Sequence, residues 1–540
     1  MAEAIVDHAA AETAKPKLDG GTHVGGKIAF LLVLLAALGF AAWNILRDVG
    51  GAGEAMAGGV FALLGLALLI ALGFEFVNGF HDTANAVATV IYTHSLPPLV
   101  AVVWSGTWNF IGVMMSSGAV AYSIVTLLPV ELILQVGSSA GYAMIFSLLI
   151  AAIIWNLGTW ALGIPNSSSH ALVGSIMGVG LANQFMAPVG QATSGVDWSQ
   201  ASKVGQALLF SPLCGFIASG LLLLVMKLLI KNKTLYQAPK ANEAPPWWIR
   251  GILIFTCTWV SWAHGGNDGQ KGMGLIMLIL IGAAPTAYAL NRTMSDNAMP
   301  AMIKSIDAAE KVFVAHAGAA PPPTTAQARQ VAGDALRTRQ LATPQVFGAL
   351  AVLSTEIETS VKEYKTLRLV PAAAVPNLRN DMYMVGDAVR LIGKQKGAVA
   401  PAEGKALGGL VKQLQAGTRF IPIWVKVAVA VALGLGTMVG WKRIVVTVGE
   451  KIGKTHLTYA QGAAAEFVAA STISLAEAYG LPVSTTHILS SGVAGTMAAN
   501  GSGLQWSTIG SIASAWVLTL PAAIFLSGTL YFLLRTILPH

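Results

Sequence analysis

The sequence contains one hydroxyl-rich motif twice, and both copies have residue types suited to binding an anion. Residues 163–170 read Gly-Ile-Pro-Asn-Ser-Ser-Ser-His, and residues 480–487 read Gly-Leu-Pro-Val-Ser-Thr-Thr-His. In each copy a proline favours a new helix start, and the Ser and Thr residues that follow are good N-caps. Because a helix N-terminus attracts anions, we expect these hydroxyls to donate to a tetrahedral oxyanion. They are Ser167, Ser168, Ser169, Ser484, Thr485 and Thr486.

Two acidic motifs precede the hydroxyl motifs, one in each half of the chain. The segments GFHDTANA and GGNDGQKG contain Asp82 and Asp268 within apolar surroundings. A carboxylate inside a membrane is costly and marks a functional site by default. With the nearby amides of Asn85 and Asn267, these carboxylates offer oxygen ligands for Na⁺, Mg²⁺ or Ca²⁺, and a carboxylate alone can carry a proton. We therefore predict a cation-coupling or metal site at Asp82 and Asp268.

Three further residues near the acidic motifs could support that site. Glu75 lies two turns before Asp82 and either joins the acidic cluster or faces another helix. Gln270 adds an amide. Lys271 could neutralise Asp268, reach the anion, or point outward to the membrane interface. The sequence leaves these three roles of Lys271 open.

Histidines also occur in the motifs, at His81, His170 and His487. Each could relay protons or make a hydrogen bond, and the recurrence of His170 and His487 favours hydrogen bonding. Ser, His and Asp together raise the alternative of a hydrolase inside the membrane. That reading is disfavoured, because the hydroxyls come as symmetric triplets and no Gly-x-Ser-x-Gly segment surrounds them.

The composition indicates a polytopic membrane protein. Hydrophobic residues make up 54% of the chain and charged residues 11%, against about 25% charge in a soluble domain. A span needs about 20 apolar residues. We expect spans near 28–46, 57–78, 98–118, 141–162, 203–230, 249–264, 272–290, 420–440, 457–478 and 508–536. Shorter apolar segments at 83–95, 165–185 and 482–498 are expected to be half-helices or re-entrant hairpins.

A hydrophilic insert interrupts the second half. Residues 291–420 hold 26 of the chain's 58 charged residues, and their apolar periodicity predicts a small extramembrane helical bundle. The acidic motifs are offset by 186 residues (82 to 268) and the hydroxyl motifs by 317 (170 to 487). The difference of 131 matches the insert, so two homologous halves with one insertion account for both offsets.

The expected organisation follows from these offsets. It comprises an N-terminal extension with one extra apolar helix (1–50), a first membrane repeat (51–230), a basic inter-repeat loop (231–248), the start of a second repeat (249–290), the insert (291–420) and the remainder of the second repeat (421–540). Residues 119–140 contain no Lys or Arg, whereas their counterpart contains Lys442, Arg443, Lys451 and Lys454. By the positive-inside rule the two repeats are expected to be inverted.

Several classes of protein are disfavoured by the same sequence. The net charge of +8 fits basic cytoplasmic loops, and no basic stripe with interleaved aromatic residues indicates a nucleic-acid partner. No Gly-x-x-x-x-Gly-Lys-Ser/Thr segment is present, which removes the simplest case for an ATP-driven pump. Cys214 and Cys257 both lie in apolar spans and imply no disulfide framework.

The motif residues resemble the PiT family of inorganic phosphate transporters, most closely its bacterial low-affinity PitA type. The resemblance covers GFHDTANAVATVIYT (79–93), AAIIWNLG (151–158), GGNDGQKGMG (265–274) and PVSTTHILSSGVAGTM (482–497). It implies inverted repeats, a multi-pass protein of the inner membrane, often a homodimer, and cation symport of phosphate. For the bacterial branch it implies proton coupling and transport of a neutral complex with a metal such as Mg²⁺. By motif, the six hydroxyls would bind phosphate, and Asp82, Asn85, Asn267 and Asp268 would form the cation and substrate shell.

Alternatives to proton-coupled phosphate transport stay open on the sequence. The same architecture could transport another tetrahedral oxyanion such as sulfate, or could couple phosphate to Na⁺. A passive channel and the hydrolase are the weakest readings. The expected partners are therefore inorganic phosphate and the lipid bilayer, with no covalently bound cofactor.

Overall fold

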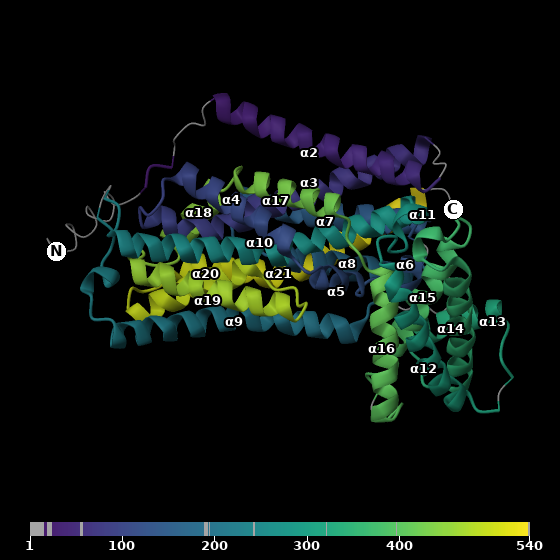
Figure 1. Cartoon of the computed structure of the whole chain (residues 1–540). Helices are drawn as coiled ribbons and strands as arrows, with labels where there is room; N and C mark the ends of the chain where they lie inside the picture. Colours follow the sequence, from purple (N-terminus) through teal and green to yellow (C-terminus); the bar gives the residue numbers. More distant parts are fainter. Residues whose placement is uncertain are drawn as a thin grey trace.

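The computed structural model describes residues 16–18, 24–53, 58–134, 136–187, 193, 195–240, 243–319, 321–395 and 397–537, except the side chains of residues 83–85 and 130. Within these ranges no β-strand occurs and the regular elements are helices, which confirms the all-α fold class. Figure 1 shows the long helices side by side in one bundle, with a group of shorter helices crossing its end. That group belongs to the hydrophilic insert.

Six helices in the described ranges are long and apolar enough to span a membrane. They are α2 (Val24–Gly51), α3 (Gly58–Tyr92), α4 (Pro98–Met115), α7 (Ser139–Ala161), α9 (Trp198–Leu229) and α21 (Trp506–Ile537). Large apolar side chains on the outer helices, such as Leu209 and Phe525, are exposed, as lipid-facing residues are. A seventh span is possible if α16 (Pro401–Thr418) and α17 (Ile423–Thr437), bent by 75° at their junction, count as one.

The other helices of the membrane part surround or contain the motifs. They are α5 (Ala119–Val125), α6 (Val130–Leu134), α8 (Ser168–Phe185), α10 (Trp247–Ala283), α11 (Pro285–Tyr288), α18 (Lys442–Val446), α19 (Tyr459–Ala478) and α20 (Thr485–Asn500). Single turns occur at η1 (Lys233–Tyr236) and at η4 (Thr447–Lys451), which is a π-helical turn.

Two expected breaks are absent, and the expectation was wrong at both. The segments 57–78 and 83–95 are one helix, α3, and the segments 249–264 and 272–290 are largely one helix, α10. The Gly-rich acidic motifs therefore lie inside long helices and do not interrupt them. Their glycines serve close packing, since a Cβ at Gly265 would lie 2.1 Å from the carbonyl oxygen of Asn109 on α4.

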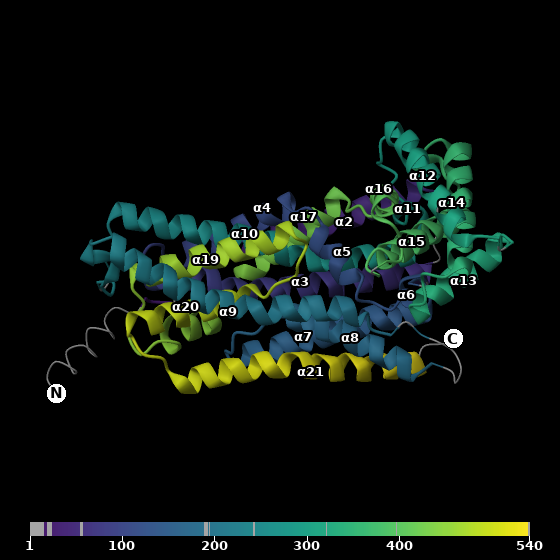
Figure 2. The same cartoon turned by 90° about the horizontal axis from the view of Figure 1, so that it is seen from below.

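Helices of one half of the chain pack against helices of the other half, and these contacts occur in equivalent pairs with the two halves reversed. α3 of the first half packs on α17 of the second, and α10 of the second half packs on α4 of the first. In the same way α8 packs on α21, and α20 packs on α9. Figure 2 shows the α7, α8 and α21 layer from below. Such reciprocal pairing is what two homologous repeats produce, while their inverted orientation and the dimer stay predictions.

The insert forms a helical bundle with its own apolar core. Its helices are α12 (Met299–Ala317), α13 (Thr325–Thr338), α14 (Pro344–Tyr364), α15 (Val375–Ile392) and α16, with single turns η2 (Asp296–Ala298) and η3 (Leu367–Leu369). Phe313, Leu350 and Val385 are buried in this core. Because α13 touches α6, and α11 touches α15, the insert is fixed against one end of the membrane bundle.

The glycine contacts predict a sharp difference between two positions of α3. A Cβ at Gly79 would lie 2.2 Å from the carbonyl oxygen of Leu433, which is backbone and cannot rotate away, whereas Gly73 has open space around it. Gly79→Ala should therefore destabilise the protein by about 1–3 kcal/mol. Gly73→Ala should be neutral, or stabilising by up to about 1 kcal/mol. Thermal unfolding of the purified variants measures both, and equal stability of the two would contradict the close crossing.

Candidate substrate and cation site

Both hydroxyl motifs fold as the N-termini of buried helices. Gly163 and Gly480 adopt positive φ angles of 68° and 63°, a conformation that favours glycine, and each turns the chain after the preceding helix. The hydroxyl oxygen of Ser167 then accepts the backbone N–H of His170 at 3.2 Å, and Ser484 accepts that of His487 at 3.1 Å. Ser167 and Ser484 are thus the N-caps of α8 and α20.

The two helix N-termini meet each other. Ser169 on α8 donates its hydroxyl hydrogen to the carbonyl oxygen of Val483 at 2.8 Å, and Val483 immediately precedes the N-cap residue of α20. The rings of His170 and His487 lie 4.6 Å apart, and His487 also stacks on Trp516 at 4.1 Å. The positive ends of two helix dipoles therefore converge on one buried region, which favours negative charge there.

Each hydroxyl motif contacts the acidic motif of the other half. The hydroxyl of Thr486 donates to the Oδ1 atom of Asp82 at 2.8 Å. The same carboxylate oxygen lies 3.0 Å from Nδ1 of His81, and Nε2 of His81 lies 3.3 Å from the Thr159 hydroxyl. All four side chains are buried. Asp82 is consequently held by groups from α3 and α20, and His81 ties it to α7.

Lys271 connects the acidic motif of the second half to the hydroxyl motif of the first half. Its ammonium lies 2.7 Å from Oδ1 of Asp268 on the same helix and donates a short hydrogen bond to the hydroxyl of Ser169 on α8. Lys271 is fully buried, so it does not reach the membrane interface. Of the three roles that the sequence left open, pairing with Asp268 is observed, and the contact with Ser169 places the ammonium beside the first hydroxyl motif.

Asp82 and Asp268 come together in one cluster that could hold a cation. With His264 they present three potential ligand atoms within 4.8 Å of one another, all from buried residues. Nε2 of His264 lies 3.5 Å from Oδ2 of Asp268, while its Nδ1 lies 2.8 Å from the amide oxygen of Asn109. Sequence reasoning missed His264, although its position four residues before Asp268 places both on one helix face.

Two equivalent hydroxyls in this region lack partners. The Oγ atom of Ser168 and the Oγ1 atom of Thr485 are buried and have no hydrogen-bond partner in the described part of the chain. They occupy the same place in the two motifs, at the first residue of α8 and of α20. A buried hydroxyl without a partner costs free energy, so both are suited to donate to a ligand.

The remaining predicted residues lie around the cluster. Asn267 donates to the carbonyl oxygen of Leu481 at 3.1 Å, and Gln270 donates to Glu477 at 3.2 Å. Glu75 is buried against α10, where a Cβ at Gly272 would lie 2.3 Å from its Oε1 atom. Glu75 therefore faces α10 at the acidic motif of the second half. The side chain of Asn85 lies outside the described residues.

Glu466 on α19 is a buried carboxylate that sequence reasoning missed. Thr256 on α10 donates to its Oε2 atom at 2.5 Å, and Thr89 on α3 makes a short hydrogen bond to Oε1. The carboxylate therefore joins three helices that also carry or border the acidic motifs. The available signal was a single acidic residue inside an apolar span.

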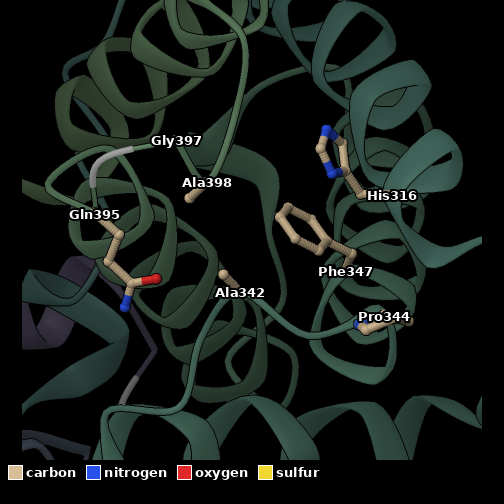
Figure 3. Close-up of a pocket in the computed structure, with 7 residues that line it drawn as sticks. All are labelled: His316, Ala342, Pro344, Phe347, Gln395, Gly397 and Ala398. Atoms are coloured by element: carbon tan, nitrogen blue, oxygen red, sulfur yellow. The ribbon is translucent and has the colours of Figure 1, made fainter.

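An open pocket of about 470 Å³ lies elsewhere, in the insert. Figure 3 shows its lining, with the His316 ring near Phe347 and with Gln395 on the opposite wall. The ring of His316 stacks on Phe347 at 4.7 Å, and its Nε2 atom pairs with Glu403 at 3.1 Å. None of the motif residues lines this pocket, so it is separate from the buried polar cluster.

The chain forms a helical bundle with a buried polar site, and matched motifs from its two reciprocally packed halves build that site. This is the architecture of a secondary transporter. The model of the phosphate transporter family matches residues 78–527, and the chain belongs to that family. It is an inorganic phosphate transporter of the PiT family and a multi-pass protein of the cytoplasmic (inner) membrane.

Two similar relatives of the chain are both described as low-affinity inorganic phosphate transporters. The chain is 43% identical to the low-affinity inorganic phosphate transporter PitA of Escherichia coli over 488 residues, and 41% identical to PitB of the same organism over 487. Each match covers 87% of this chain and 96% of the relative. A solved structure, the sodium-dependent phosphate transporter, aligns with 88% of this chain and 100% of its own at 22% identity, with a TM-score of 0.48. The PitA and PitB relatives are transporters, which points away from an enzyme.

The buried ion pair predicts that the loss of stability caused by replacing Lys271 depends on whether Asp268 is present. Lys271→Met leaves a buried carboxylate without its cation, which should lower the free energy of unfolding by about 3–5 kcal/mol. Adding Asp268→Asn removes the unpaired charge and should restore most of the loss. Thermal unfolding of the single and double variants measures the effect. A double variant less stable than Lys271→Met alone would contradict the pairing.

Proposed function

We propose that this transporter imports phosphate as a neutral metal–phosphate complex together with protons, through the buried cluster of the four motifs. One observation carries the proposal: Thr486 contacts Asp82, and Lys271 contacts both Asp268 and Ser169, so hydroxyl and acidic groups of both halves share a single site. A cation site and an anion site in contact with each other suit a substrate that contains both charges.

The hydroxyl motifs supply the phosphate-binding side of this site. Ser168 and Thr485 have buried hydroxyls without partners in the described residues, one on each helix N-terminus. Ser169 and Thr486 add donors that presently satisfy protein acceptors, and Lys271 adds a positive charge beside Ser169. Neutral donors from two helix ends, with one ammonium, bind a dianion without holding it irreversibly.

The acidic motifs supply the cation-binding side. Asp82 and Asp268 offer carboxylate oxygens, and His264 offers an imidazole nitrogen. Carboxylates suit Mg²⁺, and the imidazole extends the set of acceptable cargo to divalent transition metals. The metal ion in this proposal is cargo that enters with phosphate and leaves with it.

Charge balance favours neutral cargo and cation coupling. Phosphate near neutral pH is mostly a dianion, and each charge moved against the membrane potential costs about 2.3 kcal/mol per 100 mV. The site contains three carboxyl groups, those of Glu75, Asp82 and Asp268, and one lysine ammonium, that of Lys271, so full ionisation of the carboxyl groups would leave an excess of negative charge. Protons or a divalent cation would neutralise this excess negative charge before the anion enters.

The proposed mechanism is alternating access with the two hydroxyl motifs as gates. The Ser169–Val483 hydrogen bond and the His170–His487 contact hold the two motifs together in this structure. Separating them on one side or the other would open the shared site to that side while the long helices stay packed.

Loss of either carboxylate should abolish coupling. Asp82→Asn and Asp268→Asn each keep the side-chain size and remove one negative charge, so labelled-phosphate uptake should fall to background while folded protein stays in the membrane. Asp307→Asn, on the exposed surface of the insert, is the matched control and should transport normally. Normal uptake by both site variants would refute the cation-site assignment.

The coupling ions can be separated in proteoliposomes that contain the purified protein. Uptake should require an inward proton gradient and Mg²⁺, and should not change when Na⁺ is replaced by K⁺. Uptake that needs Na⁺ would reassign Asp82 and Asp268 as sodium ligands. If unlabelled sulfate competes as well as unlabelled phosphate, the site is a general oxyanion site and the specific phosphate proposal fails.

A further inference from the structure

A small cavity lies where the insert meets the membrane bundle. Its volume is about 50 Å³, and α5, α10, α15 and the end of α16 contribute to its wall. The polar lining residues are Tyr122, Thr126, Arg379, Tyr383, Thr418 and Arg419. A water molecule needs at least about 10–15 Å³ of such space, so the cavity holds several waters or one small oxyanion.

The two arginines of this cavity have no carboxylate partner. Neither Arg379 nor Arg419 forms an ion pair within the described residues, and the guanidinium of Arg419 forms no hydrogen bond there. Arg419 lies over the ring of Tyr122 at 5.3 Å, and Arg379 lies over the ring of Tyr383 at the same distance. Arg379 also donates to the carbonyl oxygen of Ile133 at 3.2 Å and to the side-chain oxygen of Asn380 at 2.9 Å, both of which are uncharged acceptors.

The two carboxylates of α15 are paired with other arginines. Asp387 pairs with Arg390 at 2.6 Å, and Asp381 pairs with Arg329 at 2.8 Å. The cavity therefore keeps an excess of positive charge from its own two arginines. Arg379 is only 7% exposed, and leaving a buried guanidinium without a counter-ion is costly.

Two further features indicate that the cavity suits an anion. The hydroxyl of Tyr122 is buried and has no hydrogen-bond partner among the described residues. Burial lowers the pKa of Arg379 and of Arg419, which is the direction expected for cations without a counter-ion. Two guanidiniums and a tyrosine hydroxyl match the hydrogen-bonding needs of a phosphate group, because guanidinium donates to it in a bidentate geometry.

The cavity is connected to the transport site through two helices. Gly274, Met277 and Leu278 of α10 line it and lie three to seven residues after Lys271 on the same helix. On the other wall, α5 donates the backbone N–H of Val120 to the side-chain oxygen of Gln270 at 2.9 Å. An anion that holds α15 and α16 against α5 and α10 would therefore affect the position of the acidic motif.

We propose that Arg379, Arg419 and Tyr122 form a second phosphate-binding site, outside the transport pathway, through which the insert regulates uptake. The ligand chemistry is a phosphate group, supplied by free inorganic phosphate or by the headgroup of an anionic lipid. The site uses none of the residues assigned to transport, so the two proposals stand or fall separately.

Equilibrium binding of labelled phosphate to the delipidated full-length protein tests the site. Wild type should bind one more phosphate per chain than the Arg379→Gln/Arg419→Gln variant. Tyr122→Phe, which removes one hydroxyl and keeps the ring under Arg419, should retain the fold and weaken the second site about tenfold or more. Arg368→Gln, an exposed arginine of the insert, is the matched control and should bind as wild type does.

Adding vesicles of phosphatidylglycerol, with phosphatidylcholine as the neutral control, distinguishes the two sources. Displacement of the second labelled phosphate by phosphatidylglycerol alone identifies a lipid headgroup as the occupant, and no displacement identifies free phosphate. Uptake is also measured in proteoliposomes while the phosphate concentration is varied on the side of the membrane that carries the insert. The double variant should respond to this concentration differently from wild type. Equal binding stoichiometry in wild type and double variant, with unchanged affinity in Tyr122→Phe, would overturn the inference even if transport is normal.

Discussion

The buried pairing of Lys271 with Asp268 and Ser169 is the interaction on which the site depends. Charges inside a membrane protein are tolerated only where other groups pair with them, so this ammonium and this carboxylate require α10 and the N-terminus of α8 to lie together. The equivalent contact of Thr486 with Asp82 requires the same of α20 and α3. Four helices from two halves are thus fixed around one point by polar contacts.

Close helix crossings make this convergence sterically possible. Apolar side chains drive little association inside lipid, so helices there associate through close packing, which small residues allow. Gly112 and Gly265 bring α4 and α10 into contact, and Gly79 and Gly436 do the same for α3 and α17. The glycines of the acidic motifs consequently position Asp82 and Asp268 without breaking their helices. Packing and chemistry share the same short segments, which is why these segments are rich in both glycine and polar residues.

Much of this arrangement could be predicted from the sequence, and the failures have physical causes. The doubled hydroxyl motif identified both helix N-termini, because proline, glycine and N-cap residues act locally. The same local reasoning was wrong about breaks in α3 and α10, where glycine serves a tertiary contact. His264 and Glu466 were missed because their roles depend on partners far away in sequence, such as Asn109 and Thr256.

The two halves pack in equivalent ways but differ in the charged residues that they contribute to the site. This difference is relevant to the direction of transport in the proposed mechanism. The offset that aligns Asp82 with Asp268 places Lys271 opposite Asn85, and His264 opposite Asn78. The ammonium and the third potential metal ligand therefore both come from α10, the helix that continues to the insert. An ideally symmetric site would have equal energy when open to either side. Only the second half supplies Lys271 and His264, and only that half contains the insert. In the proposed alternating-access mechanism the two open states would therefore differ in energy, and regulation through α10 would act on one of them more than on the other.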